Sequence, residues 1–566
     1  MTGHLDGGDA VVSAFQRTGA DYIFSSPGSE WAPAWESLAR RHRDGVPCPK
    51  YLDLTHETVA VGMATGYGLL TRRAQGVLLH AGPGLLQGSM AIHGALLAGA
   101  PMVVASSEST TYGDGDGPDP GGQWYRNLSV VGGPHAMAQP FVKWANQAGS
   151  VSTLYTMVTR SAEMAERAPA GPTYLNVPLE VLLEPWEDRN TSTVAAKGTT
   201  VSAPAETARV LDLLAEAENP VIVTETTGRE ADGMEALVGF AEALRIPVVE
   251  PGSAVCVNFP RDHALHAGGD IEPFMDTADL ILLVNCRAPF YPPSRRPAKA
   301  KVVVIDEVPQ RPHIAYQVLY ADHYLEGGVA ATLREMTRIA GGKAAPAALL
   351  ERRSAAQLQR RSADTEAFEA AERRAAESAD IDPVGLVAAL REALADDDPV
   401  VVDETITHSR LVQRHMRRST PDSYLYVQGG LGQGIAWALG AKLAAPERPV
   451  VLTVGDGAFM YNPIVQSLDA SRTYGLPLLV VVFNNRQYRS MKLNHLRFYP
   501  EGAAVETGDF LGTDLSGQPE LSAFAEPFGM HAESVTSNAD LAPALARALK
   551  AVREGTTAVV NVAVSR

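Results

Sequence analysis

The sequence predicts an α/β protein made of three doubly wound domains, each built on a parallel sheet. Its 566 residues are too many for one domain, and 45% hydrophobic residues with 50 glycines is ordinary for large α/β proteins. Short, continuous apolar runs recur along the chain, and such runs are typical of strands covered on both faces. We expect domains at 1–190, 200–340 and 381–566, with a charged, Ala-rich helical linker at 341–380.

The first domain shows strand and turn signals in chain order. A small-residue helix is predicted after Glu57, and an apolar strand at 77–79 ends at His80 and a Gly-Pro-Gly turn. An Ala-rich helix is predicted over 89–99, and residues 171–178 are predicted to form the last strand. A histidine at the carboxyl end of a strand can titrate near neutral pH and move protons.

The second and third domains repeat these signals. Apolar runs at 220–224, 281–284 and 302–306 predict strands of the second domain. In the third domain, runs at 449–454 and 476–483 predict two buried strands.

A helix joins those last two strands in the prediction. Asn462 can cap it, Pro463 suits its first position, and Gly475 follows its end. The result is a β-α-β unit, in which the two strands run parallel.

Polar side chains follow both strands of this unit. Gly455-Asp456-Gly457 ends the first strand and Asn484-Asn485 ends the second, which places Asp456 and Asn485 29 positions apart in sequence. Because parallel strands carry their carboxyl ends to the same sheet edge, where ligands bind, we expect these two side chains to lie close together. Their oxygens suit a hard cation that keeps phosphate oxygens among its ligands, so Mg²⁺ and a bound diphosphate are predicted.

These motifs resemble the signature of thiamine diphosphate-dependent enzymes of the acetohydroxyacid synthase and benzoylformate decarboxylase superfamily. The resemblance implies an N-terminal pyrimidine-binding domain, a central domain and a C-terminal diphosphate-binding domain. It implies that Asp456, Asn485 and the backbone oxygen of Gln487 hold Mg²⁺, and that Gly455, Gly457 and Ala458 lie against the diphosphate. Ala458 stands where many members have Ser, which leaves backbone amides to make that contact. The alternative is a chance turn in an ordinary nucleotide-binding domain.

Glu57 matches the family's glutamate beside the aminopyrimidine ring. Protonation of that ring favours the imino form, whose nitrogen removes the thiazolium C2 proton. The alternative is a first-turn glutamate that the helix dipole favours.

The segment from Phe24 to Glu30 and the spacing from Glu57 to His80 resemble benzoylformate decarboxylase. By this resemblance, Ser29 and His80 bind the substrate carboxylate and shuttle protons; the alternatives are a turn residue and a structural histidine. The resembled enzyme's second active-site histidine has no counterpart in 287–292, so the protonation step stays open.

A glycine-rich stretch at 427–434 precedes the third domain's metal motif. In the resembled family a carbonyl here accepts from the cofactor's 4′-amino group and an apolar side chain supports its bent conformer, roles that fit Gly429 and Leu431. Tight packing is the alternative reading of the glycines.

Composition indicates which kinds of partner and which cellular compartment the sequence favours. A formal charge of −17 makes nucleic acid an unsuitable partner. Cys48, Cys256 and Cys286 are widely separated, which fits a reducing cytoplasm, and no membrane span or leader is expected.

Two charged segments have simple interpretations. The acidic segment from Asp114 lacks the glutamate that a calcium loop needs at its twelfth position, where Tyr125 stands, and is expected to be a loop. A basic cluster follows the metal strand and is either a solvated face or an entry for an anionic substrate; it contains Arg486, Arg489, Lys492, His495 and Arg497.

The function expected from these residues is thiamine diphosphate- and Mg²⁺-dependent decarboxylation of a 2-oxo acid. An acetolactate synthase-like carboligase is the alternative, and an inactive regulatory homologue is the non-enzyme alternative. A nicotinamide oxidoreductase would need Gly-x-Gly-x-x-Gly, of which Gly82-Pro83-Gly84 supplies only a part. No motif indicates FAD. The resemblance implies a homodimer or homotetramer whose chains share active sites.

Overall fold

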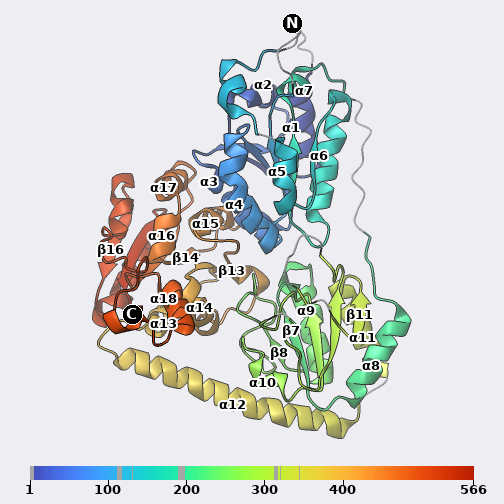
Figure 1. Cartoon of the computed structure of the whole chain (residues 1–566), viewed down its shortest axis with the longest axis vertical. Helices are drawn as coiled ribbons and strands as arrows, with labels where there is room; N and C mark the ends of the chain where they lie inside the picture. Colours follow the sequence, from blue (N-terminus) through green and yellow to red (C-terminus); the bar gives the residue numbers. More distant parts are fainter. Residues whose placement is uncertain are drawn as a thin grey trace. The chain divides into compact units, whose positions relative to one another are not determined.

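Three parallel sheets organise the chain (Figure 1). The computed structural model describes residues 5–110, 118–130, 132–188, 198–292, 294–311, 317–318, 320–342 and 345–565. The acidic segment around Asp114 lies outside them. The described residues form two compact units. One holds the residues up to 188 together with 427–447 and 461–476, and the other holds the remaining residues from 198 onward.

The N-terminal sheet has six parallel strands in the order β2-β1-β3-β4-β6-β5. Buried side chains of α1 and α6 pack on one face of this sheet, and α3 contacts β1 and β3. The strands are β1 (Tyr22–Ser26), β2 (Lys50–Asp53), β3 (Gln75–Leu79), β4 (Met102–Ser106), β5 (Ala145–Gln147) and β6 (Pro172–Asn176). The helices are α1 (Gly7–Arg17), α2 (Ala32–Asp44), α3 (Glu57–Thr71), α4 (Pro83–Ala98), α5 (Pro134–Ala138), α6 (Val151–Glu166) and α7 (Leu179–Leu183).

The central sheet has five parallel strands in the order β11-β10-β9-β7-β8, with an apolar cluster on each face. Alternate side chains of one strand enter different clusters, as for Leu282 and Leu283 of β9. The strands are β7 (Pro220–Thr224), β8 (Val248–Val249), β9 (Leu280–Val284), β10 (Lys301–Asp306) and β11 (His323–Glu326). The helices are α8 (Pro204–Glu216), α9 (Gly233–Leu244), α10 (Glu272–Met275) and α11 (Val329–Gly342).

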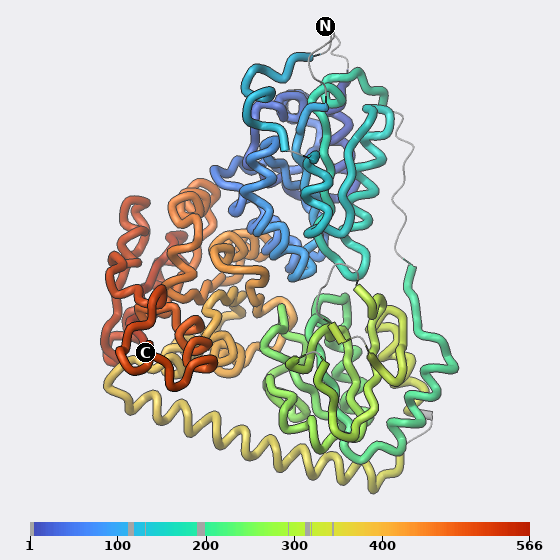
Figure 2. Tube along the Cα trace, in the orientation of Figure 1, coloured from blue at the N-terminus to red at the C-terminus, as the bar shows by residue number. Residues whose placement is uncertain are grey.

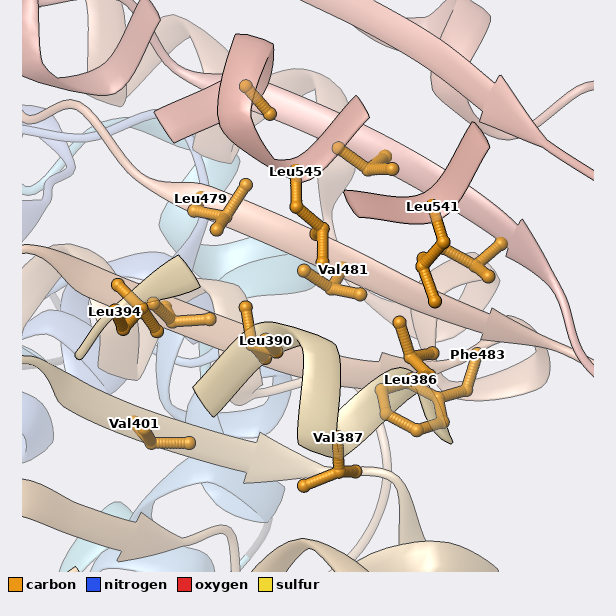
Figure 3. Packing of buried hydrophobic residues seen from close by; sticks show 14 of the residues in the cluster. Leu386, Val387, Leu390, Leu394, Val401, Leu479, Val481, Phe483, Leu541 and Leu545 are labelled. Carbon is orange, nitrogen blue, oxygen red and sulfur yellow. The ribbon is translucent and has the colours of Figure 1, made fainter. Parts of the chain in front are cut away.

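The third sheet has the order β13-β12-β14-β15-β17-β16, all parallel. Figure 3 shows Leu386 and Leu390 together with Leu541 and Leu545 packed over Val481, a single apolar layer that buries one face of the sheet. The strands are β12 (Val400–Glu404), β13 (Tyr424–Tyr426), β14 (Val450–Gly455), β15 (Leu479–Asn484), β16 (His531–Val535) and β17 (Ala558–Ala563). The helices that follow the linker are α13 (Pro383–Ala393), α14 (Ser409–Met416), α15 (Gly434–Ala444), α16 (Asp456–Tyr461), α17 (Ile464–Thr473), α18 (Arg489–Phe498), α19 (Ala503–Thr507) and α20 (Asn538–Arg553).

A single long helix, α12 (Ala347–Glu377), connects the central sheet to the third (Figure 2). Among the described residues, no helix combines the length and the apolar character that crossing a bilayer requires.

The three-domain α/β prediction is confirmed, while two helices differ from their predicted bounds. The helix predicted to start near residue 89 is α4, which starts at Pro83 because proline suits a first turn. The helix predicted to start at Pro463 is α17, which starts one residue later. Asn462 does not cap it, because the Asn462 side chain accepts the N–H of Ile435 at 3.2 Å.

Candidate active site

The N-terminal and third sheets, which are the two outer sheets in chain order, each have one position where topology alone predicts ligand binding. In both sheets, the second strand in chain order pairs with one edge of the first strand, and the third strand pairs with its other edge. The reversal leaves a crevice beyond the carboxyl ends of the first and third strands. In the N-terminal sheet these are β1 and β3, and in the third sheet they are β12 and β14.

Glu57 begins α3 in the first unit. His56 precedes the helix, and its Nδ1 accepts the N–H of Thr58 at 3.1 Å, which caps the first turn. The Glu57 side chain is half-buried. Gly88 of α4 lies opposite, where an added Cβ would stand 3.5 Å from the Glu57 Cβ. A glycine here therefore lets α4 approach the carboxylate closely.

His80 follows β3 and pairs with Glu30, which follows β1. The His80 Nδ1 donates to the Glu30 Oε1 at 2.8 Å, and the peptide N–H of Ala81 donates to the same oxygen at 2.7 Å. The hydrogen bond to Glu30 raises the pKa of His80, burial opposes the rise, and the charges of Glu30 and Glu57 add to it. Glu57 and His80 therefore lie close enough for their charges to interact.

Glu30 was not among the residues predicted from sequence, whereas its neighbour Ser29 was. The structure exposes Ser29 and buries Glu30 to 9% exposure. The two share the 3₁₀ helix Ser29–Trp31, which directs neighbouring side chains to different surroundings. Glu30 is identified by its contact with His80, 50 positions away, which no local sequence pattern indicates.

The first unit also contains Gly429 and Leu431. Gly429 has φ +82°, and an added Cβ would lie 2.6 Å from the Gly94 Cα of α4, so the glycine-rich stretch packs directly against this helix. Leu431 is half-buried. Tight packing of the glycines is thus present, and the proposed cofactor contacts of both residues stay predictions.

The second unit contains Asp456, the first residue of α16. β14 pairs in parallel with β15, so Gly455 lies opposite Phe483 and both strands end at one edge. The Asp456 Oδ1 accepts the N–H of Gly457 at 2.9 Å. Burial raises the pKa of Asp456, and the peptide N–H groups of Gly457, Arg486 and Gln487 oppose this rise. Asp456 therefore stands beside the segment that follows Asn485.

Asn484, the last residue of β15, and Asn485, the residue after it, have different partners. Asn484 accepts from the Gln518 Nε2 at 2.8 Å and donates to the Asn561 Oδ1 at 3.0 Å. The Asn485 Oδ1 accepts the N–H of Gln487 at 3.0 Å, and the Gln487 carbonyl accepts the N–H of Arg489 at 2.9 Å. Asn484 is thus held within the protein, and Asn485 turns the chain at the edge.

Gly457 and Ala458 leave little space around the same edge. An added Cβ at Gly457 would lie 2.2 Å from the Tyr488 ring, and Ala458 is buried. The ring of Tyr488 therefore lies against the backbone of Gly457. Among the described residues no group of three or more His, Cys, Asp or Glu could hold a metal, so a cation here would need the amide, backbone and phosphate oxygens named above.

His408 is the last residue of the 3₁₀ helix Ile406–His408, which follows β12. It is 4% exposed, its ring lies 5.7 Å from that of Phe483, and no described residue hydrogen bonds to its Nε2. Burial, with the charge of Arg489, lowers the pKa of His408 to about 4. A buried polar atom without a partner at a ligand-binding edge fits a site for a phosphate-bearing group.

Comparison with known families agrees with this architecture. The descriptions of the matching models are "Thiamine pyrophosphate enzyme, N-terminal TPP binding domain" at residues 5–129, "central domain" at 207–336 and "C-terminal TPP binding domain" at 406–562. Thiamine pyrophosphate is another name for thiamine diphosphate. The chain belongs to the thiamine pyrophosphate-dependent enzyme family.

Individual relatives span nearly the whole chain. Benzoylformate decarboxylase of Pseudomonas aeruginosa is 28% identical over 96% of each chain, and acetolactate synthase of Bacillus subtilis is 23% identical over 96% of this chain and 91% of that protein. Among solved structures, a thiamine diphosphate-dependent 4-hydroxybenzoylformate decarboxylase from Rhodococcus jostii RHA1 matches with a TM-score of 0.76 and 22% identity over 99% of each chain. That likeness shows the shared fold.

Proposed function

We propose that this enzyme uses thiamine diphosphate and Mg²⁺ to decarboxylate a 2-oxo acid. The observation that carries the proposal is the meeting of Glu57 with the Glu30–His80 pair at one edge of the N-terminal sheet. The edge thus combines a carboxylate for the cofactor's pyrimidine with a group that can deliver a proton to product. Similarity to benzoylformate decarboxylase along almost the full chain supports the same reaction class.

The proposed binding residues divide between two domains. Residues 1–190 would bind the aminopyrimidine through Glu57, and residues 381–566 the diphosphate. Asp456, Asn485 and the carbonyl of Gln487 would hold Mg²⁺, with the backbone of Gly455, Gly457 and Ala458 beside the phosphates. Gly429 would accept from the 4′-amino group, and Leu431 would support the bent cofactor.

The chain's own residues then have distinct tasks. When bound, thiamine diphosphate supplies an electron sink for the pair released with CO₂. Glu57 holds a proton at the pyrimidine, Ser29 binds the substrate carboxylate, and His80 returns a proton to the product. Burial raises the pKa of Asp456, and an adjacent cation would favour its ionised form.

Carboligation is the second candidate. Similarity to acetolactate synthase supports it, and in that reaction a second carbonyl replaces the proton as the electrophile. A panel of 2-oxo acids, assayed for CO₂, aldehyde and hydroxy ketone, separates the two. CO₂ with aldehyde is the expected result, and CO₂ with hydroxy ketone alone would instead assign a carboligase.

The Glu57→Gln variant tests the catalytic assignment. It keeps the shape of the side chain and cannot ionise, so we expect CO₂ release to be lost while thiamine diphosphate still binds in a calorimetric titration. Glu36→Gln, on the exposed surface of α2, is the matched control and should behave as wild type. Full activity in Glu57→Gln would contradict the assignment, and wild-type protein that binds cofactor without any turnover would favour a regulatory homologue.

We further propose a homodimer or homotetramer in which two chains complete each site, and a cytoplasmic location based on the widely separated, unpaired cysteines.

A further inference from the structure

We propose that Glu30 is the positioning residue of His80, fixing the imidazole with its proton on Nδ1 so that Nε2 exchanges the proton with the reacting molecule. This inference rests on the proposed function, because it assigns the proton carrier of the same site. It concerns a residue that the sequence comparison with benzoylformate decarboxylase did not single out.

The backbone holds both partners in place. β1 and β3 are neighbouring parallel strands, and the N–H of His80 donates to the Ser26 carbonyl at 3.1 Å. The Trp31 indole N–H crosses the other way and donates to the Leu79 carbonyl at 2.8 Å, with Trp31 fully buried. Each chain segment is therefore tied to the other on either side of the Glu30–His80 contact.

Two glycines leave the space that the Glu30 and His80 side chains occupy. A Cβ at Gly28 would lie 1.8 Å from the His80 Nδ1 and 2.2 Å from the Glu30 Oε2, so only glycine leaves room for the contact. A Cβ at Gly84 would lie 2.9 Å from the His80 Cβ. The pair fills the space that these two glycines leave.

The bonding pattern sets the tautomer. Glu30 Oε1 accepts two hydrogen bonds, from the His80 Nδ1 and from the Ala81 N–H, and a carboxylate offers no proton in return. The Nδ1 of His80 is therefore the protonated nitrogen of the neutral ring. Among the described residues Nε2 has no hydrogen-bond partner, which leaves it available to a ligand.

Two carboxylates, Glu30 and Glu57, are the charged groups that act on His80. The hydrogen bond to Glu30 is the largest influence and raises the pKa of His80, against the opposing effect of burial. A neutral amide in place of Glu30 removes that influence. The pKa of His80 should then fall, and fewer molecules carry the imidazolium at neutral pH.

The test compares wild type with Glu30→Gln, which keeps an acceptor oxygen for the Ala81 N–H and removes the charge. Imidazole ¹⁵N spectra of the cofactor-free protein, assigned with His80→Ala, report the tautomer and the pKa without any turnover. We expect an Nδ1–H tautomer in wild type and a lower His80 pKa in Glu30→Gln. The high-pH limb of kcat should move to lower pH with it, because His80 loses its proton earlier, and kcat at neutral pH should fall roughly ten- to hundredfold.

A double variant separates positioning from a general structural effect. If Glu30 acts through His80, adding Glu30→Gln to His80→Ala changes kcat no further. Additive losses would overturn the proposal. So would an Nε2–H tautomer in wild type, or a His80 pKa that moves while the kinetic profile stays in place.

Another glutamate provides the matched control. Glu372 accepts from the His415 Nδ1 at the same 2.8 Å, in the second unit. Glu372→Gln should leave the His80 signals and the pH profile unchanged, and a shift there would overturn the assignment of the effect to Glu30. If wild type turns over no 2-oxo acid, the proposed function fails. The ¹⁵N spectra then decide the Glu30–His80 pairing independently.

Discussion

Glu108, just beyond β4, is a buried carboxyl group without a cation partner among the described residues. It is 5% exposed, its Oε1 accepts the N–H of Val130 at 2.9 Å, and its Oε2 has no partner. Burial raises its pKa from 4.5 to about 7. The folded protein therefore holds a proton between these pH values that the unfolded chain has lost, and stability falls as pH rises through this window.

Glu108→Gln should remove that pH dependence. The amide cannot ionise, so we expect the variant to be more stable than wild type by about 3 kcal/mol at pH 8, with little difference near pH 4.5. Thermal unfolding followed across this pH range measures it. Glu36→Gln, which is exposed, should show no such divergence, and equal pH profiles for wild type and Glu108→Gln would contradict the burial argument.

The contribution of His408, which follows β12, to cofactor binding can be measured separately. With a pKa of about 4 the ring is neutral at pH 7, and its unpartnered Nε2 can donate to or accept from a ligand. His408→Ala should weaken binding of thiamine diphosphate by roughly tenfold, the value of one hydrogen bond to a charged group. Calorimetric titration with Mg²⁺ present measures the loss, and unchanged affinity would show that the ring faces no part of the cofactor.

Helix packing in the first unit depends on glycines that bring α3 and α15 into contact. An added Cβ at Gly66 would lie 2.0 Å from the Trp437 carbonyl oxygen, and one at Gly440 would lie 2.0 Å from the Met63 carbonyl oxygen. Backbone cannot yield as a flexible side chain does. α3 begins at Glu57, so its placement depends on this contact.

Gly66→Ala should therefore destabilise the protein by about 1–3 kcal/mol, as overpacking does. Gly239→Ala is the control, because a Cβ there meets nothing within 4 Å and alanine favours the α9 helix. Thermal unfolding of both variants tests the contact. If Gly66→Ala unfolds at the wild-type temperature, the helices do not pack this closely.

At the β14–α16 junction, Gly457 and Gly455 differ in the space around them. A Cβ at Gly457 would meet the Tyr488 ring at 2.2 Å, whereas one at Gly455 would stay 3.7 Å from the Thr405 carbonyl oxygen. Gly457→Ala should thus weaken Mg²⁺-dependent cofactor binding more than Gly455→Ala, because it displaces the ring that lies against Gly457, the residue after Asp456. Titrations of both variants with Mg²⁺ and cofactor rank them, and the reverse order would contradict this reading.

The secondary structure could be predicted from the sequence where a local residue pattern determines it. The apolar run at 220–224 became β7 with the same bounds, because continuous burial leaves few alternatives. The turn chemistry of Gly455-Asp456-Gly457 concealed α16, since the same residues also suit a helix start. Glu30 pairs with a histidine 50 positions away, and His408 stands out only through its burial. Neither contact has a local sequence signal.

For the whole molecule, the proposed sharing of active sites between chains predicts complementation between two inactive chains. Glu57→Gln and Asp456→Ala should each be inactive alone, because each removes one half of every site. Mixed oligomers restore sites that take Glu57 from one chain and Asp456 from the other, and random pairing should recover roughly a quarter of wild-type activity. Sites completed within a single chain would give no recovery, which activity assays of the co-expressed pair reveal.

The two outer sheets share one strand order, with β2-β1-β3-β4-β6-β5 repeated as β13-β12-β14-β15-β17-β16. All six placements agree, and a gene duplication would leave this pattern. After such an event each copy was free to diverge. One sheet carries the helix that begins at Glu57 and the other the strand end at Asp456, so each unlike end of the proposed cofactor would have its own version of the same architecture.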